Sequence, residues 1–228
     1  MDVTTASAPA LRYRNEGNLR LLDLISRPPG RVLDVGCGPG DNAAIMAGRG
    51  WRVEGVTIDP EEARAARSVC ARVHVGDLEK GLPDSIEGTF DVAIFSHVLE
   101  HIRQPESTLR QVAPLLGADG VVAVALPNVL HYRQRLAFFR GRFDYTDTGI
   151  LDRTHLRFYT YASARMMIES AGYRVLDSVP DGPLPVGRLT TRLPDRMRNS
   201  LRTLALSQLP GLLAYQSLFV ARPSQLTD

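Results

Sequence analysis

Short apolar runs alternate with amphipathic stretches through the first 130 residues of the chain. The apolar runs are typical of strands that are buried on both faces of a sheet, and the stretches between them have helical spacing. Such alternation predicts crossover connections and a mostly parallel sheet between layers of helices. The predicted strands are Val32–Val35, Val53–Ile58, Val73–Val75, Val92–Phe95 and Val121–Leu126, and the predicted helices are Ala43–Ala47, Glu61–Cys70 and Glu106–Leu116.

The two ends of the chain depart from this pattern. Residues 1–10 are predicted to be a disordered tail, and an amphipathic helix is predicted between Leu11 and Ile25, before the Pro28-Pro29-Gly30 break. After Asn128 the chain becomes polar and rich in aromatic residues, without a simple period. The last part is predicted to contain a helix at Ala162–Ala171, a strand at Tyr173–Val179, a Pro-, Gly- and Arg-rich loop with one or two helices, and a strand at Tyr215–Ala221.

These elements predict a seven-stranded, mostly parallel α/β sheet whose last strand is antiparallel. Residues 11–228 are expected to form one domain, with a lid and acceptor-binding region at about 128–160 and 180–212. A net charge of +2 provides no general attraction for nucleic acid. Two cysteines make no disulfide framework, and neither a signal peptide nor an apolar run of about 18 residues is present, which favours a cytoplasmic protein without a transmembrane segment.

The strongest chemical signal is the stretch Arg31–Gly40, RVLDVGCGPG. A buried strand runs into Gly36, Gly38 and Gly40, and a helix begins close behind them. Glycines at such a turn let the backbone approach a ligand, and the helix N-terminus offers unpaired N–H groups. The alternatives are a tight turn without a ligand, or the G-x-G-x-x-G turn of a nicotinamide enzyme, although the spacing here is G-x-G-x-G.

An acid two positions before the first glycine completes a resemblance to motif I of class I S-adenosylmethionine (SAM) methyltransferases. Further stretches that resemble this family follow in its order: WRVEGVTID, VGDL, TFDVAIFSHVLEHI and DGVVAVALPN. The chain looks closest to the MetW-like and ubiquinone-biosynthesis-like branch. The resemblance implies a Rossmann-like fold, SAM as cofactor and S-adenosylhomocysteine (SAH) as product. The cofactor-binding residues that it implies are Asp34, Gly36, Cys37, Gly38, Asp77, Leu78, Ser96 and His97.

The expected ribose-binding acid is displaced in this sequence. The family places Asp or Glu at the tip of the second strand, where this chain has Thr57, and the next acid is Asp59. Relatives of the cyclopropane-fatty-acid-synthase type also carry Thr there. Thr57, Asp59 and Glu62 therefore all stay candidates, and Asp59 before Pro60 is equally suited to capping a helix.

Histidines dominate the candidates for catalysis. SAM itself supplies the reactive cation, so no metal is required. The segment His97–His101 also reads H-x-x-E-H, a zinc-hydrolase pattern, if both imidazoles lie on one helix. His101 is as suited to a structural role as to a catalytic one.

The segment from Asn128 to Tyr159 is the predicted acceptor site, because it follows the fifth strand at the ligand-binding edge of the sheet. We expect His155 to act as general base, with Asp152 or Arg153 orienting it or the substrate. A structural hydrogen-bonded turn is the competing interpretation. His131 and Tyr132 join Arg153 as candidate substrate-binding residues.

Arginines gather in a second segment, Arg188–Arg202, ahead of several leucines. It could cover an anionic or lipid-linked acceptor or lie on a membrane surface, but a solvated helix face is the favoured interpretation. The predicted reaction is methyl transfer from SAM to an oxygen of a small molecule, a sugar or a secondary-metabolite intermediate. A non-catalytic, MetW-type partner protein is the main alternative, and apolar residues near both termini permit a homodimer.

Overall fold

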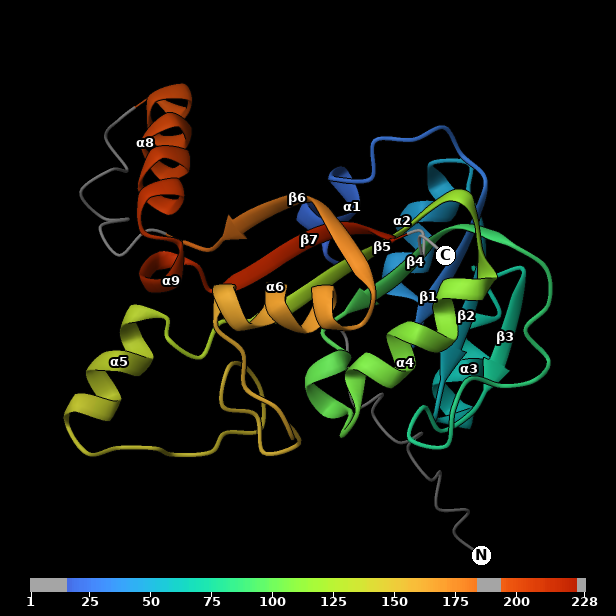
Figure 1. Ribbon diagram of the computed structural model, residues 1–228, viewed down its shortest axis with the longest axis horizontal. Coiled ribbons are helices and arrows are strands. Elements are labelled where there is room, and N and C mark those ends of the chain that lie inside the picture. The colour runs from blue at the N-terminus through green and yellow to red at the C-terminus, as the bar shows by residue number, and fades with distance from the viewer. Residues whose placement is uncertain (1–15, 184–193, 225–228) are drawn as a thin grey trace, which may run out of the picture.

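A seven-stranded sheet forms the centre of the computed structural model, which describes residues 16–183 and 194–224 (Figure 1). The strand order is β3-β2-β1-β4-β5-β7-β6. The strands are β1 (Arg31–Val35), β2 (Arg52–Thr57), β3 (Arg72–Val75), β4 (Phe90–Ser96), β5 (Leu116–Pro127), β6 (Tyr173–Asp181) and β7 (Gln216–Pro223).

Strand direction follows the prediction. The first five strands pair in parallel, and β7 pairs antiparallel with both β5 and β6. The predicted seven-stranded, mostly parallel sheet with an antiparallel last strand is therefore confirmed. Because parallel strands end at the same edge, the loops that leave β1, β2 and β4 meet there.

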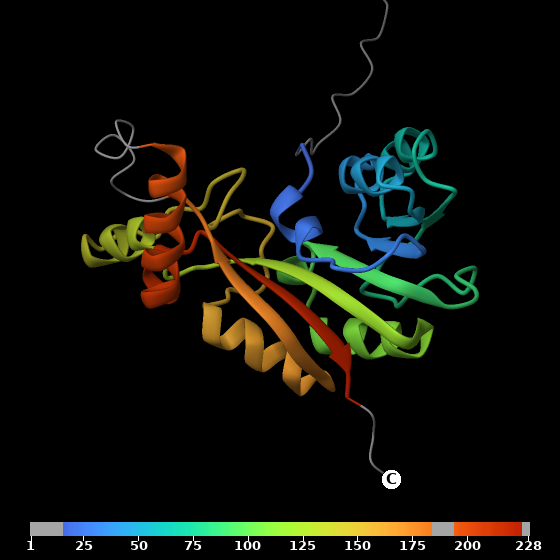
Figure 2. The ribbon, with the colours of Figure 1, turned by 90° about the horizontal axis from the view of Figure 1, so that it is seen from above.

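Helices cover both faces of the sheet, as Figure 2 shows from above. One face packs against α4 (Pro105–Val112) and α6 (Tyr161–Ser170), and the other against α1 (Leu19–Asp23), α2 (Asp41–Gly48) and α3 (Pro60–Ala66). Alternate residues of a strand enter different cores: Val32 packs with α1 and α2, whereas Leu33 packs on the α4 and α6 side. Both faces of the central strands are buried, which explains their continuous apolar runs.

Two predicted helices end earlier than expected. The helix predicted to reach Cys70 ends at Ala66, and the helix predicted to reach Leu116 ends at Val112. A single 3-10 turn, Ala113–Leu115, follows the second helix, and Leu116 already belongs to β5. Pro114 explains this end, since proline has no N–H for an α-helical bond and clashes with the preceding turn.

The remaining elements lie beyond the sheet edge where β5 ends. They are α5 (Tyr132–Phe139), the irregular chain from 140 to 160, α8 (Asp195–Gln208) and α9 (Pro210–Leu213). The helices predicted in the Arg-rich segment are confirmed, although Arg188 and Arg192 lie outside the described residues, as does Leu11. Within residues 16–183 and 194–224, no helix is long and apolar enough to cross a membrane.

Candidate functional site

The glycine turn after β1 forms the floor of the site. Gly36, Gly38 and Gly40 have φ angles of 77°, 53° and 100°, a region that side chains other than glycine avoid. A Cβ on Gly36 would lie 2.4 Å from Val98 Cγ2. A Cβ on Gly38 would meet no atom within 4 Å, so open space adjoins the backbone at this position.

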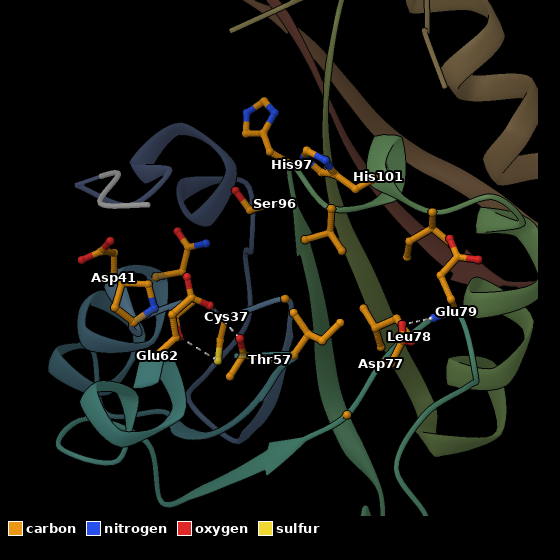
Figure 3. Close-up of a pocket in the computed structure, with 18 residues that line it drawn as sticks. Cys37, Asp41, Thr57, Glu62, Asp77, Leu78, Glu79, Ser96, His97 and His101 are labelled. Carbon is orange, nitrogen blue, oxygen red and sulfur yellow. Dashed lines mark hydrogen bonds between the residues drawn. The ribbon is translucent and has the colours of Figure 1, made fainter. Parts of the chain in front are cut away.

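That space is part of a cavity of about 330 Å³ at the C-terminal ends of β1, β2 and β4 (Figure 3). The position agrees with the rule that open α/β sheets bind ligands at this edge. Most of the predicted cofactor-binding residues line the cavity: Gly36, Cys37, Gly38, Thr57, Asp77, Leu78, Ser96 and His97. Asp34 and Asp59 are absent from its wall.

The three candidates for ribose binding have different positions. Asp59 is the N-cap of α3, where its Oδ1 accepts a hydrogen bond from the Glu61 N–H at 2.8 Å. Thr57 and Glu62 both line the cavity, and the Thr57 hydroxyl donates to Glu62 Oε2 at 2.8 Å. Glu62, in the first turn of α3, therefore presents a carboxylate beside the end of β2, five residues after the position expected for the acid.

Asp77 and Leu78 lie across the cavity from Thr57. Asp77 Oδ1 accepts from the Glu79 N–H at 3.0 Å, which closes the turn after β3. The turn holds both of these predicted cofactor-binding residues on the cavity wall.

Buried polar atoms without partners lie beside the glycine turn. Neither carboxylate oxygen of Asp34, nor the hydroxyl of Ser96, has a hydrogen-bond partner among the described residues. Burial, with a smaller contribution from Asp41, raises the pKa of Asp34 to about 7. Buried acceptors without partners are costly. Ser96 lines the cavity, and its hydroxyl fits the ammonium group of an amino acid, which the methionyl end of SAM carries.

Cys37 contributes backbone rather than thiol chemistry. Its N–H and that of Gly36 both donate to the Val56 carbonyl at 2.8 Å, which ties the turn to β2. Burial raises the pKa of the Cys37 thiol, so the side chain is a neutral packing group.

His97 follows β4 in a left-handed conformation with φ 57°. Its Nδ1 lies 3.2 Å from Glu100 Oε1, and its Nε2 lies 2.8 Å from Gln216 Oε1 on β7. Burial disfavours the charged ring, but the hydrogen bond and charge of Glu100 outweigh it and raise the pKa of His97. His97 is thus held at the cavity wall by contacts of both ring nitrogens.

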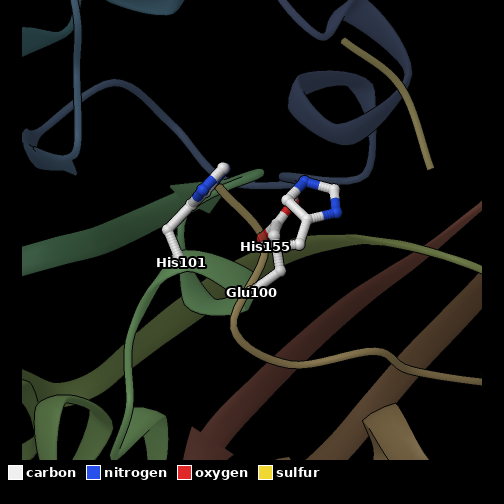
Figure 4. A group of neighbouring side chains, drawn as sticks. All are labelled: Glu100, His101 and His155. Atoms are coloured by element: carbon white, nitrogen blue, oxygen red, sulfur yellow. The ribbon is translucent and has the colours of Figure 1, made fainter. Parts of the chain in front are cut away.

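The zinc-hydrolase alternative fails on backbone geometry, because no helix spans His97 to His101. Only the 3-10 turn Leu99–His101 is helical, and its N-cap is Val98. A different set converges: one ligand atom from each of Glu100, His101 and His155 lies within 4.8 Å of the others (Figure 4). These three side chains could hold a cation, which the sequence did not predict.

His101 lines the cavity and is held from behind by a short chain of hydrogen bonds. Its Nδ1 lies 3.2 Å from the Thr154 carbonyl and 3.1 Å from the Thr154 hydroxyl. That hydroxyl donates to Asp152 Oδ1 at 2.6 Å. Since a carbonyl only accepts, Nδ1 of His101 is the donor in this contact, which leaves Nε2 as the ring nitrogen that can offer a lone pair.

His155 lies behind His101, at a ring-centroid distance of 4.7 Å, and does not line the cavity. Its side chain is 6% exposed, with Nδ1 at 3.0 Å from the Ile150 carbonyl and Nε2 at 4.0 Å from Glu100 Oε1. Burial lowers the pKa of His155, although Glu100 acts in the opposite direction. The Asp152 carboxylate accepts hydrogen bonds from the N–H and the hydroxyl of Thr154, and the Asp152 carbonyl accepts one from the His155 N–H.

The predicted substrate-binding residues lie outside the cavity wall. Arg153 points to Asp147, with which it forms an ion pair at 2.7 Å. His131 is buried at the N-cap of α5, 4.4 Å from the Tyr132 ring. Glu100, Thr154 and Gln216 were not predicted as site residues. Of these three, only Glu100 could have been identified from the sequence, as the acid between the two histidines of the H-x-x-E-H stretch.

Comparison with known proteins gives consistent matches. A methyltransferase-domain family model matches residues 10–178. The chain is 35% identical over 99 residues to a ubiquinone biosynthesis O-methyltransferase of Neisseria meningitidis, covering 40% of this chain and 42% of that protein. It is 32% identical over 160 residues to a probable S-adenosylmethionine-dependent methyltransferase of Mycolicibacterium smegmatis, covering 68% and 57%. These matches span about half the length of the curated relatives.

Solved structures show the same fold at low identity. A SAM-dependent methyltransferase from Mesorhizobium loti superposes with a TM-score of 0.60 at 17% identity, covering 90% of this chain and 96% of that one. The magnesium protoporphyrin IX methyltransferase of Synechocystis, solved with bound SAH, gives 0.59 at 16% identity, covering 90% and 80%.

Proposed function

This chain belongs to the methyltransferase-domain family of class I SAM-dependent enzymes, and we propose that it transfers a methyl group to an oxygen of a small molecule. The observation that carries the proposal is His101, whose ring lines the cavity and is held by Thr154 and Asp152. When bound, SAM supplies an electrophilic methyl group and leaves as SAH. The chain's own residues have to hold the donor, exclude water and take a proton from the acceptor.

Different residues of the cavity wall would bind different parts of SAM. The bare backbone at Gly36–Gly38 would lie along the methionyl end, with the Ser96 hydroxyl on the cavity wall supplying an acceptor for its ammonium group. Glu62, with Thr57 beside it, would take the ribose hydroxyls. Asp77 and the backbone at Leu78 would hold the adenine ring.

His101 is the general base in this proposal, with His155 behind it. The lone pair on His101 Nε2 is the one that the Thr154 contacts leave available. An acceptor hydroxyl at the cavity mouth would give its proton to this nitrogen as the new O–CH₃ bond forms. His155, buried against Glu100, would support the ring of His101 by edge contact rather than touch the acceptor.

Relatives favour oxygen as the accepting atom, because they include ubiquinone biosynthesis O-methyltransferases and a malonyl-[acyl-carrier protein] O-methyltransferase of Geobacter sulfurreducens, alongside a norajmaline N-methyltransferase of Rauvolfia serpentina. The ubiquinone and norajmaline enzymes support a small molecule as the substrate class. A sugar or secondary-metabolite hydroxyl fits the same chemistry. Cys37 and Cys70 are free, buried thiols, which suits a reducing, cytoplasmic setting.

Calorimetric titration with SAM and SAH tests the proposal directly. We expect Glu62→Gln to weaken SAM binding about tenfold, because a charged hydrogen bond to a ribose hydroxyl is worth about 1.5 kcal/mol. Glu61→Gln is the matched control, since Glu61 is exposed and pairs with Arg64. Equal affinities in the two variants would remove Glu62 from the ribose site. Failure of the unaltered chain to bind SAM would favour a non-catalytic partner protein.

A further inference from the structure

Helix α8 carries an apolar stripe on the side that faces away from the sheet. The stripe consists of exposed residues spaced i, i+4 and i+7, a spacing that places them on one side of a helix: Met197, Leu201 and Leu204. The opposite side holds the helix to the molecule. There Leu206 is buried in a cluster with Leu213 and Ala214, and Arg202 binds Asp181.

Arginines border the stripe on both sides. At 100° per residue, Arg196 and Arg198 lie on opposite flanks of the line through Met197 and Leu201. Long arginine side chains can lie along an apolar surface and extend their charge to its border. An apolar stripe with basic borders is typical of helices that lie in a membrane interface.

Helix α5 repeats the arrangement. Leu136 and Phe139 are exposed, and Phe139 is the most exposed large apolar residue described, at 91%. Arg133 and Arg140 lie one turn before Leu136 and directly after Phe139. An exposed phenylalanine costs solvation free energy unless another surface covers it.

The two helices lie at the same end of the molecule, as both views show (Figures 1 and 2). Helix α9 connects them, because Arg135 donates to the Gly211 carbonyl at 3.2 Å and Leu213 packs on α8. We call this part the α5–α8 end, comprising residues 132–145 and 194–215.

Charge is concentrated at the α5–α8 end. Residues 132–145 hold four arginines and one aspartate, and residues 194–215 hold three arginines and one aspartate. Because Arg202 is paired with Asp181, the net charge of this end together with Asp181 is +4. The whole chain has a net charge of +2, so the remainder is net negative. The positive charge is therefore local to the surface that exposes Phe139 and the α8 stripe.

We propose that the α5–α8 end docks on an anionic lipid bilayer, with Phe139 and the α8 stripe in the interface and the arginines at the headgroups. Each arginine near an anionic membrane adds about 1 kcal/mol of attraction. A second copy of the chain fits this surface less well, because symmetric pairing of the same end would bring two clusters of positive charge together. The cavity opens at the sheet edge that α5 follows, so docking would bring the site close to the membrane surface.

Co-sedimentation with vesicles tests the proposal independently of methyl transfer. We expect the full chain to bind vesicles containing 30% phosphatidylglycerol (about one lipid in three) at least tenfold more tightly than pure phosphatidylcholine vesicles, with the difference shrinking as salt rises. Phe139→Ser and Leu201→Ser should each weaken binding about tenfold. Arg140→Gln should weaken it about fivefold.

Matched controls lie on the other parts of the molecule. Met166→Ser on α6 removes an exposed apolar side chain, and Arg110→Gln on α4 removes an exposed arginine, and neither should change vesicle binding. Absence of binding to the anionic vesicles would overturn the proposal. So would equal losses in the control variants. A dimer in light scattering that Phe139→Ser converts to a monomer, without vesicle binding, would assign the surface to a second copy instead.

Discussion

At the scale of single residues, His101 depends on side chains that are distant in the sequence. Thr154 and Asp152 come from the segment after β5, and the Glu100 carbonyl accepts hydrogen bonds from the Leu156 and Arg157 N–H groups at 2.8 and 3.0 Å. These bonds fix the segment on the 3-10 turn that carries His101. The orientation of His101 therefore depends on two contacts across about fifty residues of chain.

We expect His101→Gln to lower kcat by 10²- to 10⁴-fold with little change in SAM affinity, because a general base contributes in that range. Thr154→Val should lower kcat about tenfold, since the ring keeps its nitrogen but loses the hydroxyl that orients it. Single-turnover formation of SAH with an identified acceptor measures both effects.

Thr89→Val is the control for the threonine change, since Thr89 is exposed and its defined contact uses the backbone carbonyl. Its turnover should equal that of the unaltered chain. Full turnover in the His101 variant, with loss in His155→Gln, would transfer the role of base to His155.

At the scale of elements, the glycine turn is the tightest constraint. We expect Gly36→Ala to destabilise the protein by at least about 1–2 kcal/mol and to abolish SAM binding, because φ 77° is unfavourable for alanine and the new Cβ would meet Val98 at 2.4 Å. Chemical unfolding with and without SAM measures both.

The clash with Val98 and the unfavourable φ angle at position 36 can be tested separately. Adding Val98→Ala to Gly36→Ala relieves the clash but leaves the φ angle, so stability should recover only in part. Gly48→Ala is the control, because Gly48 ends α2 with open space around it and no positive φ. Full recovery in the double variant would show that backbone conformation contributes little at position 36.

Elements were predicted better than contacts, for a physical reason. Each buried strand leaves a local apolar run, and the three glycines leave a local spacing, so β1 and its turn could be read from neighbouring residues. Pro114 is also a local signal, and the helix predicted to run through it to Leu116 was too long. The link between His101 and Thr154 joins residues 53 positions apart, and no periodicity reports such a contact. Arg153 is the opposite case. The sequence predicted it at the substrate site, but in the structure it pairs with Asp147 and does not line the cavity.

At the scale of the whole molecule, buried polar groups without partners lie together at one edge of the sheet. Both carboxylate oxygens of Asp34, the Ser96 hydroxyl and Oε2 of Glu100 lie at or near the C-terminal ends of β1 and β4, and they have no hydrogen-bond partner among the described residues. Stability elsewhere, from two cores on the two faces, has to offset these groups. Such a protein should gain stability when a bound ligand satisfies them.

Asp34 makes this cost depend on pH. Its ordinary pKa is near 4, whereas burial, followed by Asp41, raises its pKa to about 7 in the folded chain. Between those values the unfolded chain ionises and the folded chain keeps its proton, so stability from this group is present below pH 4 and is lost as pH rises to 7. The loss should level off above pH 7.

Asp34→Asn keeps the shape of the side chain without the charge. We therefore expect its free energy of unfolding, relative to the unaltered chain, to rise steadily between pH 4 and pH 7 and to stay constant above that, by at most about 1.4 kcal/mol per unit of pKa difference. Urea unfolding of both proteins without SAM, at one-unit pH intervals, measures the difference. Asp41→Asn removes only the smaller of the two causes that raise the pKa of Asp34. The pH at which the stability difference levels off should therefore fall slightly. Parallel stability curves for Asp34→Asn and the unaltered chain would show instead that the buried carboxylate is already satisfied in the folded protein.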